Sequence, residues 1–147
     1  MKWLLDTNAV SEQVRRRPDP SVLRWIAERP REQVGISAVT MAELRAGALA
    51  ATEPRRTELM EWLTAEIDRS FGERIVPVSV DVLMDWIHLG RRLAERRMPR
   101  ATPDTLIAAT ARVHGLIVVT RNAKDFAGTG VTVYNPWTEE TTRMDTA

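Results

Sequence analysis

The sequence predicts an α/β fold in which a mostly parallel central β-sheet is flanked by α-helices on both faces. Two observations support this prediction. Short apolar, β-branched runs alternate along the chain with segments of helical periodicity, which is the order expected of a parallel sheet with helical crossovers. The runs are apolar throughout rather than alternately apolar and polar, as expected of strands that are covered on both faces.

Short apolar runs mark the expected strands. The first run ends at Asp6, and the fourth, which follows Gly115, is the clearest because it is rich in β-branched residues. The expected strands cover residues 2–5, 34–37, 75–78, 116–120 and 131–134.

Helical periodicity fills the segments between these runs. The last helix is expected to have Thr102 at its N-cap and Pro103 at its first helical position, and His114-Gly115 forms its stop signal. The expected helices cover residues 22–27, 38–49, 57–70, 83–93 and 103–114.

The composition excludes several classes of function. The 147 residues fit one domain, and the net charge of +1 argues against a protein that binds nucleic acid with its whole surface. The absence of cysteine excludes a disulfide framework, a thiolate zinc site and a cysteine nucleophile. No signal peptide or membrane-spanning run is visible, so we expect a cytoplasmic protein without membrane contact.

Acidic residues lie where the expected strands end, which is where ligands bind in parallel sheets. Asp6 follows the first strand and Glu43 lies on the helix after the second. Asp104 opens the helix before the fourth strand, and Asn122 and Asp125 follow that strand. We therefore expect four carboxylates from distant parts of the chain to converge on one edge of the sheet.

Converging carboxylates repel one another and are costly to desolvate, and a divalent cation relieves this conflict. A site with oxygen ligands and no His or Cys favours Mg²⁺ or Mn²⁺ over zinc. Such a metal can lower the pKa of a bound water and stabilise charge on a phosphoryl oxygen.

Each carboxylate also has a structural interpretation. Asp6 could be a turn residue at a strand end, and Asp104 an acid favoured by the helix dipole. Glu43 could form a capping box with Thr40. Asp125 could belong to an Asx-type cap of a short helix.

The order and spacing of these motifs carry a family resemblance. The motifs are Leu5-Asp6-Thr7-Asn8, Ala42-Glu43-Leu44, Asp104-Thr105-Leu106-Ile107-Ala108-Ala109-Thr110-Ala111, the segment from Thr120-Arg121-Asn122 to Asp125-Phe126, and Asn135-Pro136-Trp137. With them the chain resembles PIN-domain proteins of the VapC/FitB type, the toxins of bacterial toxin–antitoxin pairs. The resemblance implies a PIN domain over residues 1–138 and leaves a polar tail, 139–147, that we expect to be frayed unless a partner holds it.

The resemblance also implies a Mg²⁺-dependent endoribonuclease, with Mn²⁺ as a possible substitute. It implies a homodimer and an antitoxin protein that blocks the acidic groove with a basic side chain. Asp6 and Asp104 would be the main metal ligands, and Glu43 would complete the set directly or through water. The fourth acidic position is either Asn122 or Asp125. The residues expected to orient the ligands and water are Thr7, Asn8, Thr120 and Asn122.

A cluster of arginines runs toward Asp104 and is a candidate RNA-binding arm. Cations beside an acidic metal site can bind the phosphates that flank the cleaved bond. A solvated helix face is the alternative interpretation. The arginines are Arg91, Arg92, Arg96, Arg97 and Arg100.

The sequence alone leaves two other functions open. A metal-dependent phosphatase would also have an aspartate at the end of the first strand, but it usually has a second acid where this chain has Asn8. A non-catalytic RNA-binding module on the same fold would not need the carboxylates.

Overall fold

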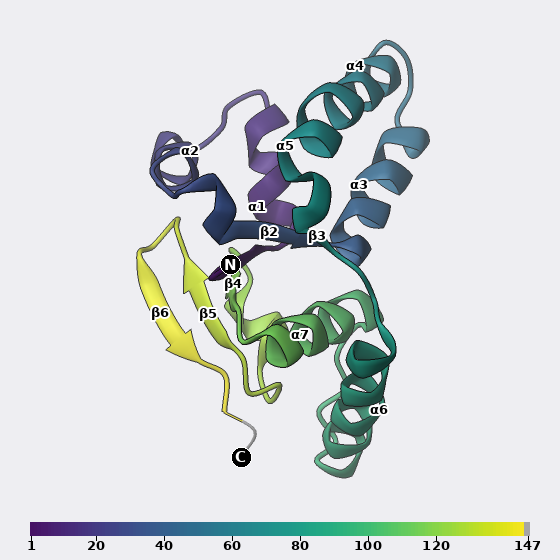
Figure 1. Ribbon diagram of the computed structural model, residues 1–147, viewed down its shortest axis with the longest axis vertical. Coiled ribbons are helices and arrows are strands. Elements are labelled where there is room, and N and C mark those ends of the chain that lie inside the picture. Colours follow the sequence, from purple (N-terminus) through teal and green to yellow (C-terminus); the bar gives the residue numbers. More distant parts are fainter. Residues whose placement is uncertain (146–147) are drawn as a thin grey trace.

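The central feature of the computed structural model, which describes residues 1–145, is a six-stranded sheet between two groups of helices (Figure 1). The strand order is β3-β2-β1-β4-β5-β6, and all neighbouring pairs are parallel except β5 and β6. This confirms the predicted α/β class. The strands are β1 (Trp3–Leu5), β2 (Val34–Ser37), β3 (Ile75–Val76), β4 (Ile117–Val119), β5 (Thr132–Asn135) and β6 (Glu140–Arg143).

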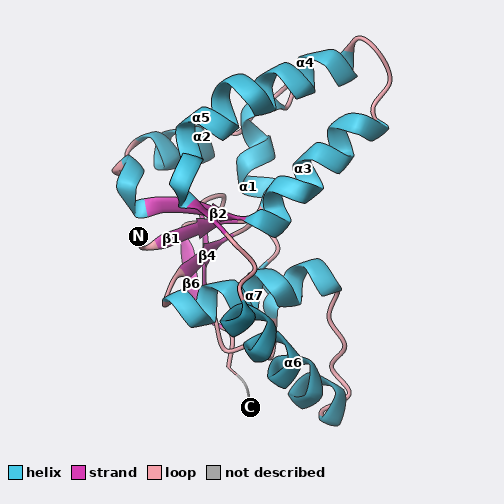
Figure 2. Ribbon diagram, turned by 45° about the vertical axis from the view of Figure 1, so that its right-hand side comes forward, coloured by secondary structure: helices cyan, strands magenta, loops and turns pink. Residues whose placement is uncertain are grey.

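Helices cover both faces of the sheet, as Figures 1 and 2 show from two directions. Helices α1 to α5 lie on one face, and α6 and α7 lie on the other. The helices are α1 (Thr7–Ser11), α2 (Pro20–Ala27), α3 (Ala38–Ala50), α4 (Arg55–Trp62), α5 (Arg69–Phe71), α6 (Val80–Glu95) and α7 (Thr102–His114), with the 3-10 helices η1 (Glu12–Val14), η2 (Arg31–Gln33), η4 (Gly72–Arg74) and η5 (Ala123–Phe126) and the π-helix η3 (Leu63–Asp68).

Two hydrophobic cores hold these layers together, one on each face of the sheet. Leu4 belongs to the core beneath α6 and α7, whereas Leu5 belongs to the core beneath the other helices. Both side chains are fully buried, and each such burial stabilises the fold by about 2 kcal/mol. Coverage of both faces is the reason why the strands are apolar throughout.

Helices α2, α4 and α6 begin two or three residues earlier than predicted, and the predicted helix 57–70 is divided into α4, η3 and α5. Helix α7 begins at Thr102, so the prediction that Thr102 is the N-cap is wrong: Ala101 holds that position and no side chain caps the helix. Gly115 ends α7 in the left-handed conformation, as its stop signal predicted. The short helix α1 was not expected, because five residues are too few to show a helical period.

The polar tail is more ordered than predicted. The expectation of a frayed tail is wrong for Glu140–Arg143, which form β6 and pair antiparallel with β5. All four side chains of β6 are exposed, so this edge strand is stabilised by backbone pairing and leaves no apolar pattern in the sequence. The last two residues of the tail, 146 and 147, lie outside the described residues.

No helix within residues 1–145 is long and apolar enough to cross a membrane.

Candidate active site

Asp6 stands at the carboxyl end of β1, which lies in the middle of the sheet. Leu5 is in register with Ile36 on one neighbouring strand and with Val119 on the other. The residue that follows each of these strands therefore comes to the same edge of the sheet. At this edge Asp6 is flanked by Thr120 and accompanied by side chains from α3 and α7.

Hydrogen bonds fix both oxygens of the Asp6 carboxylate. The backbone N–H of Thr7 donates to Oδ1 at 2.8 Å. The hydroxyl of Thr120 donates to Oδ2 at 2.8 Å, and Asn8 Nδ2 lies 3.3 Å from the same oxygen. Asp6 is thus both the N-cap of α1, as its turn interpretation suggested, and a buried carboxylate whose orientation is set by three donors.

The direction of the hydrogen bond from Thr120 to Asp6 follows from the other partners of the hydroxyl. Asn8 Nδ2 donates to Thr120 Oγ1 at 2.9 Å, and the backbone N–H of Asn122 donates to it at 3.1 Å. A hydroxyl has a single proton, so with two donors already bound it directs that proton to Asp6. Thr120 and Asn8 therefore act as one unit that orients the carboxylate.

Glu43 joins the site through α3. Its Oε1 accepts a hydrogen bond from Thr7 Oγ1 at 2.7 Å. The capping-box interpretation with Thr40 is wrong, because Ser37 is the N-cap of α3 and its hydroxyl accepts from the N–H of Val39. Glu43 is exposed at the rim of the site and is held by Thr7 instead.

Asp104 lies half-buried in the first turn of α7. Burial, together with the smaller effects of the charges of Asp6, Asp125 and Glu43, raises its pKa to about 6. Burial likewise raises the pKa of Asp6, with the charges of Glu43 and Asp125 adding to this and hydrogen bonds from Thr120 and Thr7 opposing it. Asp6 and Asp104 therefore lie within the field of the other carboxylates of the sequence analysis, at one edge of the sheet.

Asn122 and Asp125 reach this edge from η5. Asn122 is the N-cap of η5 but its side chain makes no cap hydrogen bond, so an Asx-type cap is not formed. The backbone N–H of Asp125 donates to the carbonyl of Asn122 at 3.0 Å. Of the two candidates for the fourth acidic position, Asp125 supplies a charge that acts on Asp6 and Asp104.

The chemistry of the donor set fits a hard divalent cation. All the donors are carboxylate, amide or hydroxyl oxygens, and their mutual repulsion is relieved when a cation binds. Within residues 1–145, no three His, Asp or Glu side chains stand ready to hold a metal ion among themselves. Mg²⁺ does not require such a cage, since it usually keeps several waters and binds through one or two carboxylates.

The arginines of the candidate RNA-binding arm lie on α6 and in the turn and loop that follow it. Arg91 and Arg92 lie on α6, and Arg96 and Arg97 lie in the turn after it; Figure 2 shows the following loop returning from the end of α6 to the start of α7. Arg100 has a structural role, because its Nε donates to the carbonyl of Ala127 at 3.0 Å. Among the described residues, Arg91, Arg96 and Arg97 are exposed and have no carboxylate partner.

Sequence reasoning missed one cation at the site. Arg121 follows Thr120 directly, and its backbone is bound by Asn8 and Asn135. Both Arg121 and Asn135 lie in motifs that the sequence made visible, but their contact joins distant parts of the chain. No local pattern could therefore indicate it.

A pocket of about 330 Å³ adjoins the acidic edge and is mainly apolar. Thr7 and Glu43 form the wall that it shares with the carboxylates. The pocket is lined by residues of α1, α3, α4 and the segments that follow α1 and α4: Thr7, Ser11, Val14, Arg15, Glu43, Leu44, Gly47, Ala48, Arg55, Leu59, Trp62 and Leu63.

Known proteins are similar in sequence to most of this chain. The model of the PIN domain family matches residues 3–130. The VapC ribonuclease Y4jK of Sinorhizobium fredii is 35% identical over 135 residues, which cover 91% of this chain and 96% of that protein. Toxin FitB of Neisseria gonorrhoeae is 37% identical over 135 residues, covering 91% of this chain and 97% of the toxin.

Solved structures share the fold. The chain superposes on FitAcB from Neisseria gonorrhoeae with a TM-score of 0.86 and 35% identity, over 92% of this chain and 98% of the other. A toxin–antitoxin complex from Klebsiella pneumoniae matches with a TM-score of 0.67 and 28% identity, over 92% of this chain and 98% of the other. The range matched by the family model includes all four acidic positions.

Proposed function

Because the chain belongs to the PIN domain family and matches members of the VapC and FitB type along most of its length, we propose that it is a metal-dependent endoribonuclease, the toxin of a toxin–antitoxin pair. One observation carries this proposal: Asp6 is buried at the end of the central strand within the field of three further carboxylates. Such a group of acids destabilises the metal-free fold, which favours a role in binding a cation.

Asp6 and Asp104 would be the main ligands of Mg²⁺, for which Mn²⁺ could substitute. Glu43 would complete the set, directly or through a water molecule. When bound, the ion supplies a water of lowered pKa and offsets negative charge on the phosphoryl oxygen.

The remaining residues of the site position these groups. Thr120 and Asn8 hold the Asp6 carboxylate in one orientation, and Thr7 ties Glu43 to the start of α1. Asp125 is the proposed fourth acid, since its charge acts on both main ligands. Asn122 contributes its backbone N–H to Thr120 and leaves its side-chain amide available to water.

RNA is the proposed substrate, and its approach requires cations outside the acidic edge. Arg91, Arg96 and Arg97 are exposed cations on the path between α6 and Asp104. We assign them to flanking phosphates rather than to the reaction itself.

The proposed protein partner is an antitoxin that covers the acidic edge. The Klebsiella pneumoniae neighbour is described as a toxin–antitoxin complex. The apolar pocket beside Thr7 and Glu43 is suited to receive an apolar side chain of such a partner, while a basic side chain neutralises the carboxylates. This contact can be tested by a substitution at Gly47 in the pocket wall, because an added Cβ there meets no atom within 4 Å.

A homodimer is the proposed assembly. Helix α6 exposes a stripe of large apolar side chains at helical spacing, which is unusual on a surface that faces only water. The same stripe on a second copy would cover it in a two-fold contact. The stripe consists of Val80, Leu83, Met84 and Ile87.

The function is tested by incubating the purified protein with RNA in the presence of Mg²⁺, Mn²⁺ or EDTA. We expect cleavage with either ion, none with EDTA, and none by an Asp6→Asn variant whose circular dichroism spectrum matches that of the wild type. RNA binding without cleavage would identify a non-catalytic RNA-binding module. A phosphoenzyme that hydroxylamine cleaves, as it cleaves an aspartyl phosphate, would identify a phosphatase, although the side chain of Asn8 occupies the place of its second acid and donates to Thr120.

A further inference from the structure

Arg121, in the loop that follows β4, is held by side chains on both sides of its backbone. Its N–H donates to Asn8 Oδ1 at 3.1 Å, and its carbonyl accepts from Asn135 Nδ2 at 3.3 Å. Asn135 in turn accepts the N–H of Trp137 at 2.9 Å. An exposed arginine in a loop usually has a mobile backbone, but here two amide side chains fix it.

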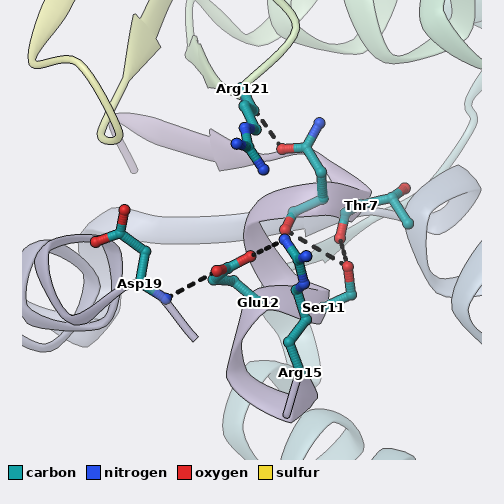
Figure 3. A network of polar contacts seen from close by, with 7 residues as sticks. Thr7, Ser11, Glu12, Arg15, Asp19 and Arg121 are labelled. Carbon is teal, nitrogen blue, oxygen red and sulfur yellow. Dashed lines mark hydrogen bonds and ion pairs between the residues drawn. The ribbon is translucent and has the colours of Figure 1, made fainter. Parts of the chain in front are cut away.

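The guanidinium of Arg121 is also partly oriented. Its Cζ lies 5.5 Å from the centre of the Trp137 ring, at a distance suited to a cation–π contact. The side chain is exposed, and none of the carboxylates in residues 1–145 lies within ion-pair distance of it. Hydrogen bonds from Ser21 lower the pKa of Asp19, and the charge of Arg121 adds a smaller lowering. Figure 3 shows the side chains of Asp19 and Arg121.

The position of Arg121 is coupled to the Asp6 carboxylate. Asn8 binds the N–H of Arg121 with its Oδ1 and binds Thr120 and Asp6 with its Nδ2. Figure 3 shows the contact between the Arg121 backbone and the side chain that rises from α1. A single asparagine therefore links the backbone of Arg121 to the Asp6 carboxylate.

We propose that Arg121 is a phosphate-binding subsite of the RNA, for a phosphate adjacent to the cleaved bond. This inference rests on the function proposed above and deepens it. RNA must approach an edge that carries four carboxylates, and a cation on the loop that directly follows Thr120 can offset their repulsion of the phosphates. A guanidinium binds phosphate with two parallel hydrogen bonds, and a fixed backbone together with an aromatic support reduces the entropy lost on binding.

The alternative is a purely structural role, in which Arg121 covers Trp137. The two roles differ in what they change. A structural arginine affects stability and kcat, whereas a phosphate-binding arginine affects KM and the salt dependence of binding.

The first experiment compares Arg121→Gln with Arg31→Gln. Arg31 is exposed in η2, just before β2, and so lies at the opposite ends of the strands. For Mg²⁺-dependent cleavage of a short RNA, we expect Arg121→Gln to raise KM about tenfold with little change in kcat, and to reduce the slope of log affinity against log salt by about 1. Arg31→Gln is expected to behave like the wild type, and Arg121→Lys to recover part of the loss.

The second experiment identifies the phosphate. A set of RNAs carries a neutral methylphosphonate at each position flanking the cleaved bond. At one position the substitution is expected to lower kcat/KM of the wild type about tenfold and to cause no further loss in Arg121→Gln, because both changes remove the same contact. Additive losses at every position, or equal behaviour of Arg121→Gln and Arg31→Gln, would overturn the proposal.

This result can be separated from failure of the proposed function. If the wild type does not cleave RNA, the nuclease assignment fails. RNA binding measured by fluorescence anisotropy in Mg²⁺ then still decides the role of Arg121: weaker binding with a reduced salt slope in Arg121→Gln supports the subsite, and unchanged binding rejects it.

Discussion

The hydroxyl of Thr120 donates to the Asp6 carboxylate at 2.8 Å, although the two residues are 114 positions apart in the sequence. Both follow neighbouring parallel strands, so the sheet brings them together. The threonine lowers the pKa of Asp6 and thereby opposes part of the effect of burial.

Replacement of Thr120 by Val is expected to lower metal affinity and RNA cleavage about 10- to 100-fold, because Asp6 loses the donor that orients it. The substitution also removes the acceptor of the Asn122 N–H and one of the two acceptors of the Asn8 amide. Thr120→Ser keeps the hydroxyl and should retain most of the activity. Calorimetric Mg²⁺ titration and cleavage rates test this, and wild-type affinity in Thr120→Val would contradict it.

Replacement of Asp104 by Asn is expected to abolish cleavage and yet stabilise the metal-free protein at pH 7. The pKa of Asp104 is raised from 3.8 to about 6, so the folded chain retains this proton to higher pH than the unfolded chain. The contribution of Asp104 to the free energy of unfolding is fully present below about pH 4 and is lost as the pH rises through about 6. Since the side chain is partly exposed, we expect a gain of only about 1 kcal/mol on removing the charge.

Urea denaturation in EDTA at pH 7 measures this gain. Glu61→Gln, which removes an exposed carboxylate from α4, is a suitable control and should change the free energy of unfolding by less than about 0.5 kcal/mol. An Asp104→Asn variant that is less stable than the wild type at pH 7 would show that the carboxylate is not strained in the metal-free state.

Metal binding is expected to weaken as the pH falls through about 6. Asp104 must lose its proton before it can bind a cation, and the raised pKa of Asp6 acts in the same direction. Affinity for Mn²⁺ should be nearly constant above pH 7 and fall about tenfold or more per unit below pH 6. Calorimetric titrations between pH 5 and 8 test this, and a constant affinity over that range would contradict it.

Glu12 is expected to be important for stability and not for catalysis. It is almost fully buried, its Oε1 accepts the N–H of Asp19 at 2.9 Å, and its Oε2 lies 3.3 Å from Arg15 Nη1 (Figure 3). Glu12→Ala should lower the free energy of unfolding by about 2 kcal/mol, because the partly buried N–H of Asp19 loses its acceptor at the start of α2. Glu12→Gln keeps an acceptor and should lose less, and equal stability of Glu12→Ala and the wild type would disprove this role.

The parts of the fold that follow from local patterns were predictable. Continuous apolar runs located five strands, and the parallel topology that they imply placed Asp6 at the ligand-binding edge of the sheet. Strand β6 was missed because its side chains are all exposed. The anchoring of Arg121 by Asn8 was missed because it depends on a contact between distant segments. Capping boxes are local, yet the alternative interpretation that pairs Glu43 with Thr40 is wrong, since Ser37 is the N-cap of α3.

The exposed stripe on α6 provides a prediction about assembly. Met84 and Ile87 are 49% and 43% exposed and stand at helical spacing, so together with Val80 and Leu83 they form a continuous apolar surface. Ile87→Asp should convert the proposed dimer to a monomer. Each copy would place a charge in an apolar contact, and a two-fold contact contains the change twice. Leu49→Asp, on α3, also replaces an exposed leucine and lies outside the stripe, so it should leave the dimer intact. Sedimentation equilibrium distinguishes these outcomes: a wild-type monomer, or a dimer that survives Ile87→Asp, would refute the assignment of α6 as the dimer contact.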